Sequence, residues 1–507
     1  MKKILFSLAS FLGLAASLFA QKYVATDGDD ANPGTIAQPF KTITRAVSVA
    51  VPGDTIYVRG GSYVLNNTIN ISAGKSGTET QRYYLFAYKN ERPLLDFSSS
   101  PVGRKGFNLN ASFWHFKGLE VKGAGDNGLE ISGGTNNIIE YCAFFENRDS
   151  GVQLNRGAAH NRIINCDSYY NADPPDNGDA DGFAPKLSVG TGNYFFGCRA
   201  WGNVDDGWDG FLEGANDMTT TLENCWTWGN GYLKDGTDPG PQANGNGFKM
   251  GGADNSNSLR LMHHFMLKNC LAFGNKQKGF DQNHNAGSML LFNCTGFNNK
   301  LANYRITEAL NPGQALTVKN SVSLVGAVEL GFFAIQEVNG WMNPFVVTAA
   351  DFLSLDPASA AAPRQAGGSL PEIDFMHLAS GSDLIDAGVD LGIPFNGTAP
   401  DLGTFESNLV AAIETEESIP AEFRLYQNSP NPFNPETAIQ FKLPRPSFVT
   451  LRVYDLSGQE VATLIDDFKS MGEHRVTWRP RSLSSGIYFY RLQAGRYSET
   501  KKLILQE

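Results

Sequence analysis

The segment Cys142-Ala-Phe-Phe-Glu-Asn147 decides the fold, because its pattern, Cys-x-x-aromatic-x-Asn, occurs six times in the chain. The other copies begin at Cys166, Cys198, Cys225, Cys270 and Cys294, so that consecutive copies are 24, 32, 27, 45 and 24 residues apart. A repeat of about 20–45 residues indicates a solenoid, whose units bury their apolar faces against one another. The flanks, for example Ser288-Met-Leu-Leu-Phe292, are apolar and typical of strands. The pattern therefore predicts an all-β parallel β-helix with about three short strands in each coil.

Each fixed position of the repeat predicts a column of side chains along the solenoid. The six asparagines should form a ladder of amides that bond to one another and to the turn backbone. The aromatic side chains should stack inside, and the cysteines should form a second inward column. Six cysteines also allow disulfides, but their shared coil position favours small, buried free thiols.

A second repeat, x-Gly-(aromatic or apolar), follows the asparagines and carries the candidate site. Its copies are Asp181-Gly-Phe183, Asp206-Gly-Trp208, Asn246-Gly-Phe248 and Lys278-Gly-Phe280, followed by Ala184, Asp209, Lys249 and Asp281. Alignment of the coils stacks Asp181 beside Asp206 and places Lys249 one coil above Asp209, on one outward edge. Insertions at Ala172–Ala180 and Gly231–Gly245 emerge around these acids, and we expect them to wall a groove that suits an extended polymer.

The N-terminus and the charge limit the class of protein. Met1-Lys-Lys3 and the apolar run Ile4–Phe19 predict a secretory signal peptide over residues 1–20, and no other apolar run is long enough to span a bilayer. The formal net charge is −11, although residues 423–507 are basic. The acidic body argues against nucleic acid as a partner.

Four regions are expected along the chain. After the signal peptide, residues 21–405 should form the β-helix, with about ten coils running from about Asp54 to about Val346. A helix between Pro39 and Val51 should cap the first coil, and residues 345–405 should pack along the body. Residues 406–422 form an acidic linker. Residues 423–507 should form a small β-sandwich, with strands at 438–441, 449–454, 474–478, 486–491 and 501–505.

The C-terminal module resembles the sorting domain of type IX secretion substrates. The resemblance rests on Tyr426-Gln-Asn-Ser-Pro-Asn-Pro-Phe433, Tyr454-Asp-Leu-Ser-Gly458 and Ser485-Gly-Ile-Tyr-Phe-Tyr490. It implies export through the outer membrane of a Gram-negative host, a location outside or on the cell, and the type IX machinery as a partner.

The central coils resemble polysaccharide lyase family 9, the pectate lyases built on a right-handed parallel β-helix. The resemblance spans roughly Tyr23 to Asn320 and rests on Asn165-Cys-Asp-Ser-Tyr-Tyr-Asn171, Gly178-Asp-Ala-Asp-Gly-Phe183, Asp205-Asp-Gly-Trp-Asp209, Asn244-Gly-Asn-Gly-Phe-Lys249 and Gly279-Phe-Asp-Gln-Asn-His-Asn285. Matched residue by residue, it implies that Asp181, Asp205, Asp206 and Asp209 bind Ca²⁺ and that Lys249 is the catalytic base.

The residue types agree with this chemistry. Calcium takes six to eight oxygen ligands, and the sequence has no cluster of His and Cys with the spacing of a zinc site. Elimination from a uronate polymer needs neutralisation of the carboxylate and a base for the neighbouring proton. Neutral Lys249 would serve as that base, so we expect activity to rise toward alkaline pH. We expect substrate contacts from Lys186, Asp281, Lys276 and Arg305.

Three classes of function remain open from the sequence. The first is a secreted, calcium-dependent pectate lyase, acting as a monomer on polygalacturonate or on another acidic uronate glycan. The second is a hydrolase that uses Asp181, Asp205 and Asp206, although the Gly-His-Gly and Arg-Ile-Lys segments of β-helical polygalacturonases do not occur. The third is a glycan-binding solenoid without catalysis, because fold alone does not establish function.

Overall fold

The computed structural model describes residues 21–253, 260–407 and 423–506, apart from 445–446, 457, 470–471, 481–482 and 495–496. The predicted signal peptide and residues 408–422 of the predicted linker lie outside the described residues. The chain groups into two compact units, the first reaching residue 407 except for two short loops. We describe each unit by itself.

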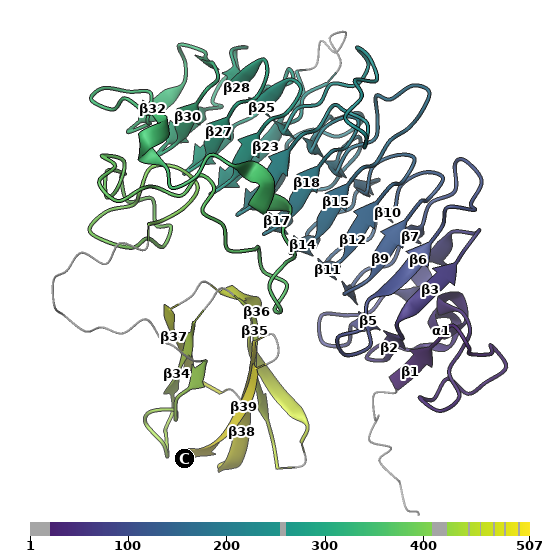
Figure 1. Cartoon of the computed structure of the whole chain (residues 1–507). Helices are drawn as coiled ribbons and strands as arrows, with labels where there is room; N and C mark the ends of the chain where they lie inside the picture. Colours follow the sequence, from purple (N-terminus) through teal and green to yellow (C-terminus); the bar gives the residue numbers. More distant parts are fainter. Residues whose placement is uncertain are drawn as a thin grey trace, which may run out of the picture. The chain divides into compact units, whose positions relative to one another are not determined.

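Three long parallel sheets build the first unit (Figure 1). Sheet A has twelve strands: β1 (Gln21–Val24), β2 (Thr55–Val58), β5 (Tyr83–Ala87), β8 (Trp114–Lys117), β11 (Ile138–Glu140), β14 (Arg162–Ile164), β17 (Asn193–Phe196), β20 (Met218–Glu223), β23 (His263–Lys268), β26 (Met289–Phe292), β29 (Leu316–Lys319) and β32 (Ile335–Glu337). Sheet B has ten: β3 (Gly61–Val64), β6 (Pro93–Asp96), β9 (Glu120–Lys122), β12 (Ala143–Phe145), β15 (Asp167–Tyr169), β18 (Arg199–Trp201), β21 (Trp226–Trp228), β24 (Leu271–Phe273), β27 (Thr295–Phe297) and β30 (Val322–Leu324). Sheet C has ten: β4 (Ile69–Ile71), β7 (Phe107–Leu109), β10 (Leu129–Ser132), β13 (Val152–Asn155), β16 (Phe183–Pro185), β19 (Trp208–Asp209), β22 (Phe248–Lys249), β25 (Lys278–Asp281), β28 (Ala302–Ile306) and β31 (Val328–Leu330). The predicted β-helix of about ten coils is confirmed, and it is right-handed.

The asparagine ladder forms as predicted. Asn147 donates from Nδ2 to Asn171 Oδ1 at 2.9 Å, and Asn171 donates to Asn203 Oδ1 at 2.8 Å. The chain of amides continues through Asn230, Asn275 and Asn299. Each Oδ1 also accepts a backbone N–H from the preceding coil, as at Asn171. A second ladder, Asn137–Asn161–Asn193, lies at the sheet C to sheet A turn and was not predicted.

The repeat aromatics do not stack inside the coil, so this prediction is wrong. The rings do stack, with centroids 4.3 Å apart for Tyr169 and Trp201 and 4.9 Å apart for Trp201 and Trp228. They stand on the outer face of sheet B. The cysteine of each copy faces inward, successive side chains of a strand point to opposite faces, and the aromatic residue three positions later therefore faces outward. Cys198 and Ala200 lie in the core, whereas Trp201 is half-buried.

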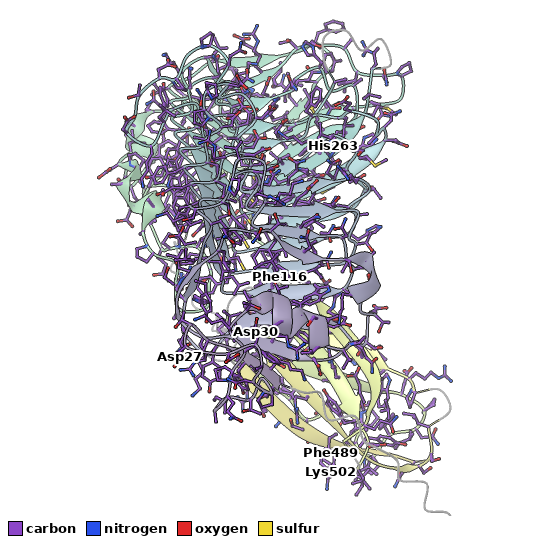
Figure 2. The ribbon with its side chains drawn as sticks, turned by 90° about the vertical axis from the view of Figure 1, so that its right-hand side faces the viewer. Asp27, Asp30, Phe116, His263, Phe489 and Lys502 are labelled. Atoms are coloured by element: carbon purple, nitrogen blue, oxygen red, sulfur yellow. The ribbon has the colours of Figure 1, made fainter. Side chains whose placement is uncertain are left out.

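The cysteine column is inward and reduced, as predicted. All six cysteines are buried and free. They pack in one continuous apolar core with residues such as Phe116, which Figure 2 shows in the interior of the solenoid.

A short helix covers the N-terminal end of the core. Helix α1 (Ile43–Val49) buries Ile43, Ala46 and Val47. It is shorter than the predicted 39–51 because Asp30 accepts hydrogen bonds from the backbone and hydroxyl of Thr42, which caps the helix. Asp30 lies beside this helix in Figure 2. The first coil also starts earlier than predicted, since β1 pairs with β2.

Of the range 345–405 that was predicted to pack along the body, residues 345–363, 370–391 and 398–405 group with the coils. They carry the short 3₁₀ helices η2 (Ala349–Asp351) and η3 (Pro357–Ala361), and another, η1 (Ala73–Lys75), lies near the N-terminus. Phe375 packs on Phe273 and Phe297 of the outer aromatic column. Arg199 fixes η3 by donating to the carbonyls of Ala360 and Ala362, both at 2.8 Å. Among the described residues, no helix is long and apolar enough to cross a membrane.

The second unit is a two-sheet antiparallel sandwich with its own core. One sheet contains β33 (Arg424–Leu425), β34 (Thr437–Leu443) and β37 (Gly472–Trp478); the other contains β36 (Glu460–Lys469), β35 (Ser447–Tyr454), β38 (Gly486–Ala494) and β39 (Tyr497–Leu505). The five predicted strands are present. Strand β36 was not predicted, because Asp466 and Asp467 lower its strand propensity and its pairing with β35 contains two register shifts.

Candidate metal centre and active site

The candidate site is a column on the outward face of sheet C. Strands β19 and β22 pair so that Asp209 lies opposite Lys249, and β25 places Asp281 next in the column. Strand β16 aligns with β19 through Phe183 and Trp208. The predicted register is therefore confirmed.

Glycine allows this close stacking. A Cβ on Gly207 would lie 2.0 Å from Thr227 Oγ1 and 2.7 Å from the Gly247 carbonyl oxygen. The glycine of the second repeat lets the coil beside Asp206 approach the asparagine ladder, which explains why glycine follows the acidic residues.

Three buried carboxylates converge in this column. One oxygen from each of Asp181, Asp206 and Asp209 lies within 4.8 Å of the others. Backbone and side-chain donors hold them: Ser150 Oγ donates to Asp181 at 3.1 Å, Asn246 N to Asp206 at 2.7 Å, and Phe211 N to Asp209 at 2.9 Å. Asp205 is not part of this group; its Oδ1 accepts from Asn244 N of the second insertion at 2.8 Å.

Two lysines contact these carboxylates. Lys249 Nζ lies 3.0 Å from Asp206 Oδ2 and 3.3 Å from Asp209 Oδ1. Lys186 Nζ lies 2.7 Å from Asp181 Oδ2 and 3.6 Å from Asp209 Oδ2. Lys186, which we expected to contact the substrate, is instead an internal counter-ion of Asp181 and Asp209.

Burial and mutual repulsion govern the charges. Burial alone would lower the pKa of Lys249, but the carboxylates of Asp206, Asp209, Asp205 and Asp181 outweigh it, and the pKa is raised well above its ordinary value. Desolvation and the neighbouring acids raise the pKa of Asp181 and of Asp205 well above the usual range. Fully ionised, the four acids would carry more charge than the two lysines balance, and a further cation would relieve the repulsion that raises the pKa values of these acids.

The donor set fits a hard divalent cation. The possible metal ligands that converge here are carboxylate oxygens, without a His or Cys among the described residues of the group, which suits calcium rather than zinc. Asp206 Oδ2 is buried and accepts no well-oriented hydrogen bond among the described residues, although Lys249 is close. The ammonium group of Lys249 uses one lone pair of this oxygen at 3.0 Å, so a metal cation could bind the remaining ones.

The remaining candidate residues are engaged with protein partners. Asp281 pairs with Lys278 at 3.0 Å, and Arg305, two coils beyond Lys249, pairs with Glu329 at 3.3 Å. Lys276 is buried and holds the second insertion through Asp238 Oδ1 at 2.6 Å and the Gly240 carbonyl at 2.7 Å.

One residue near the site escaped the sequence analysis. His263 is fully buried, with Nδ1 2.8 Å from the Gly210 carbonyl and Nε2 2.8 Å from Thr220 Oγ1. It joins sheet A to the end of β19 directly after Asp209, and it lies within the coils in Figure 2. Its residue type alone does not distinguish it from the half-buried neighbour His264.

Comparison with known proteins assigns the fold and the site to a family. Residues 22–320 match the family model described as "Pel9A-like, right handed beta helix region". The chain belongs to this family. Pectate lyase L of Dickeya chrysanthemi is 38% identical over 76% of this chain and 90% of that protein. Pectate lyase L of Paenibacillus polymyxa is 40% identical over 73% of this chain and 84% of that protein.

Solved structures agree with this Pel9A-like assignment. The crystal structure of pectate lyase Pel9A aligns with a TM-score of 0.70 and 36% identity, covering 76% of this chain and 96% of that one. A rhamnogalacturonan lyase aligns with a TM-score of 0.63 and 27% identity, covering 72% and 97%. Residues 429–506 match the secretion system C-terminal sorting domain. The chain is therefore a polysaccharide lyase that is secreted or carried on the cell surface, and both predicted resemblances are confirmed.

Proposed function

We propose that the chain is a calcium-dependent pectate lyase that cleaves polygalacturonate by β-elimination, with Lys249 as the base and the β-helix acting as a monomer. The observation that carries the proposal is the contact of Lys249 with Asp206 and Asp209 on the outward face of sheet C, in a chain whose relatives are named pectate lyases.

The carboxylates of Asp181, Asp206 and Asp209 would hold the calcium ion, with Asp205 completing the negative charge beside them. Bound calcium would neutralise the uronate carboxylate and the charge that develops next to it. Lys186, in ion-pair contact with Asp181 and Asp209, would balance part of their charge.

Lys249 would perform the proton transfer. The Lys249 side chain is mostly buried, and the carboxylates around it raise its pKa. Calcium bound to these carboxylates would offset that effect, so that at alkaline pH the neutral amine takes the C5 proton of a uronate. Removal of this proton leaves an electron pair that forms the C4–C5 double bond as the bond to the C4 oxygen breaks. The product carries a conjugated unsaturated uronate.

The first experiment measures ultraviolet absorbance during incubation with polygalacturonate, with calcium or with chelator. We expect a rise that needs calcium, falls at least about a hundredfold in Lys249→Ala, and is retained in Lys268→Ala, a lysine on sheet A. Reducing ends without absorbance would establish a hydrolase instead, and binding without either signal would establish a non-catalytic solenoid.

The alignment with a rhamnogalacturonan lyase supports a second candidate substrate. A calcium-dependent rise in absorbance on rhamnogalacturonan but not on polygalacturonate would favour it. The catalytic roles of Lys249 and the acids would be the same, because both polymers carry a uronate carboxylate beside the abstracted proton.

Export would follow from the two ends of the chain. Residues 1–20 would act as the signal peptide, residues 406–422 as the linker, and the sandwich from residue 423 as the part that the type IX machinery recognises. Loss of the chain from the medium upon deletion of residues 423–507 would test this assignment.

A further inference from the structure

A pocket of about 730 Å³ lies where the ends of β12, β15 and β18 meet the two insertions. Its walls include Arg148, Tyr170, Pro174, Tyr232, Leu233 and Lys234, and no carboxylate or lysine of the candidate active site lines it. Its volume is in the range of pockets that bind small ligands.

Backbone conformation marks this pocket as unusual within the solenoid. The residue before each ladder asparagine has a positive φ, and three successive coils place glycine there: Gly202, Gly229 and Gly274. The last coil of the repeat has Asn298, which tolerates this conformation. Only Glu146 (φ 56°) and Tyr170 (φ 57°) place other side chains at this position of the repeat. Both line the pocket, and strain of this kind is a pointer to function.

The pocket offers an ordered aromatic surface. The Tyr170 ring packs edge-on against Tyr169, with centroids 5.3 Å apart, and Lys234 Nζ lies 5.4 Å from its centre. Tyr232 stands in the second insertion on the lining of the same pocket. Aromatic faces and edges of this kind contact the C–H groups of sugar rings with little loss of side-chain entropy.

Of the two cationic side chains that line the pocket, Lys234 has a carboxylate partner and Arg148 is available to a ligand. Lys234 is paired with Glu146, and Asp235 accepts from Thr237 N at 2.9 Å. Arg148 donates from Nη2 to the Pro174 carbonyl at 2.8 Å and forms no ion pair with a described carboxylate. A guanidinium with free donors binds a carboxylate in two-point geometry.

A small apolar cluster joins the wall of the pocket to the segments that carry the acidic residues. Ala180, Val204 and Ala243 are buried together, with Ala172 and Leu233 against them. The first three directly precede Asp181, Asp205 and Asn244, so the elements that form the pocket also carry the acidic cluster.

We propose that this pocket is a second binding site for the acidic polysaccharide, in which Arg148 takes a uronate carboxylate and the two tyrosines contact the sugar rings. The identity of the sugar rests on the proposed function. Because the pocket contains no cluster of carboxylates, it binds the polymer without calcium. A long chain held at both places gains affinity from the higher effective concentration.

The test is calorimetric titration of full-length Lys249→Ala protein with trigalacturonate, first in calcium and then in chelator. We expect two sites in calcium and one in chelator. Arg148→Ala and Tyr232→Ala should each weaken the chelator-resistant site by about tenfold or more, and the fully methyl-esterified trimer should bind it similarly weakly. Lys300→Ala is the matched control, because Lys300 follows Asn299 as Arg148 follows Asn147 but lies outside the pocket.

Two results separate failure of this inference from failure of the proposed function. A wild-type enzyme that cleaves polygalacturonate but shows no chelator-resistant site, or one that both pocket variants leave intact, overturns the pocket alone. If polygalacturonate is not cleaved, the proposed function fails. The pocket proposal then fails with it only if trigalacturonate does not bind in chelator.

Discussion

Asp205 lies at the edge of the acidic cluster, where its charge is costly to keep. Burial and the charges of its neighbours raise its pKa well above the usual range, so the folded protein favours the neutral form. In contact with Asn244 N, an amide oxygen would accept the same hydrogen bond as the carboxylate.

We therefore expect Asp205→Asn to raise the melting temperature in chelator at neutral pH by about 1–4 °C, since an amide removes the cost of burying an ionisable carboxyl without loss of the hydrogen bond. Thermal unfolding followed by circular dichroism measures this. Asp176→Asn, on the exposed first insertion, should cause no change. A lower melting temperature for Asp205→Asn in chelator would contradict the electrostatic account.

Asp206 is central to the proposed calcium site, because it contacts Lys249 and has a spare buried oxygen. Asp206→Asn should weaken calcium binding by at least about tenfold, a loss typical even of outer-shell partners. Calorimetric titration with calcium alone, without substrate, provides the measurement. Unchanged affinity would place the ion elsewhere, and Asp281→Asn, two strands further along sheet C, is the comparison variant.

At the scale of the element, the asparagine ladder is the strongest specific feature of the coils. Asn203 is fully buried, donates to Asn230 Oδ1 at 3.1 Å and accepts from Asn171 Nδ2 at 2.8 Å. The ladder fixes the turn that precedes Asp205 and Asp206, so its energy is coupled to the geometry of the site.

Asn203→Ala should lower the free energy of unfolding by about 3 kcal/mol or more, since it leaves buried donors and acceptors unpaired on both sides. Urea unfolding gives the value. Asn66→Ala, at an exposed position, should change it by less than about 0.5 kcal/mol. Similar values for the two variants would show that the ladder contributes little.

At the scale of the whole molecule, His263 connects sheet A with the strand that carries Asp209. Burial lowers its pKa to about 4, against 6.5 in the unfolded chain. Between these values the unfolded chain binds the proton and the folded chain does not, so stability is complete above pH 6.5 and is lost as pH falls toward 4. The linked loss amounts to about 3 kcal/mol.

We expect His263→Gln to remove this part of the acid destabilisation, measured as the difference from wild type in urea unfolding at pH 7 and pH 4.5. The comparison must be with wild type, because Asp149, whose pKa burial raises to about 6, contributes with the opposite sign. The exposed His284→Gln should keep the wild-type dependence. If the free energy of unfolding falls by the same amount between pH 7 and pH 4.5 in His263→Gln and in wild type, the role of His263 is contradicted.

The sequence by itself determined the register of the coils. An asparagine at one turn position bonds to its neighbours only when the coils are in phase, so the spacing of Asn147 to Asn299 fixed which residues stack, and Asp181, Asp206, Asp209 and Lys249 followed from it. The free cysteines and the sandwich strands with strong alternation were predictable for the same reason: each is a local pattern repeated.

Only the tertiary structure decided what lies across the coil or between its insertions. Four features depend on contacts between segments with no common repeat: the position of Lys186 between Asp181 and Asp209, the attachment of Lys276 to the second insertion, the hydrogen bonds of His263, and the pocket at Tyr170. Insertions of different length have no register, because no ladder binds them, and packing alone sets their course.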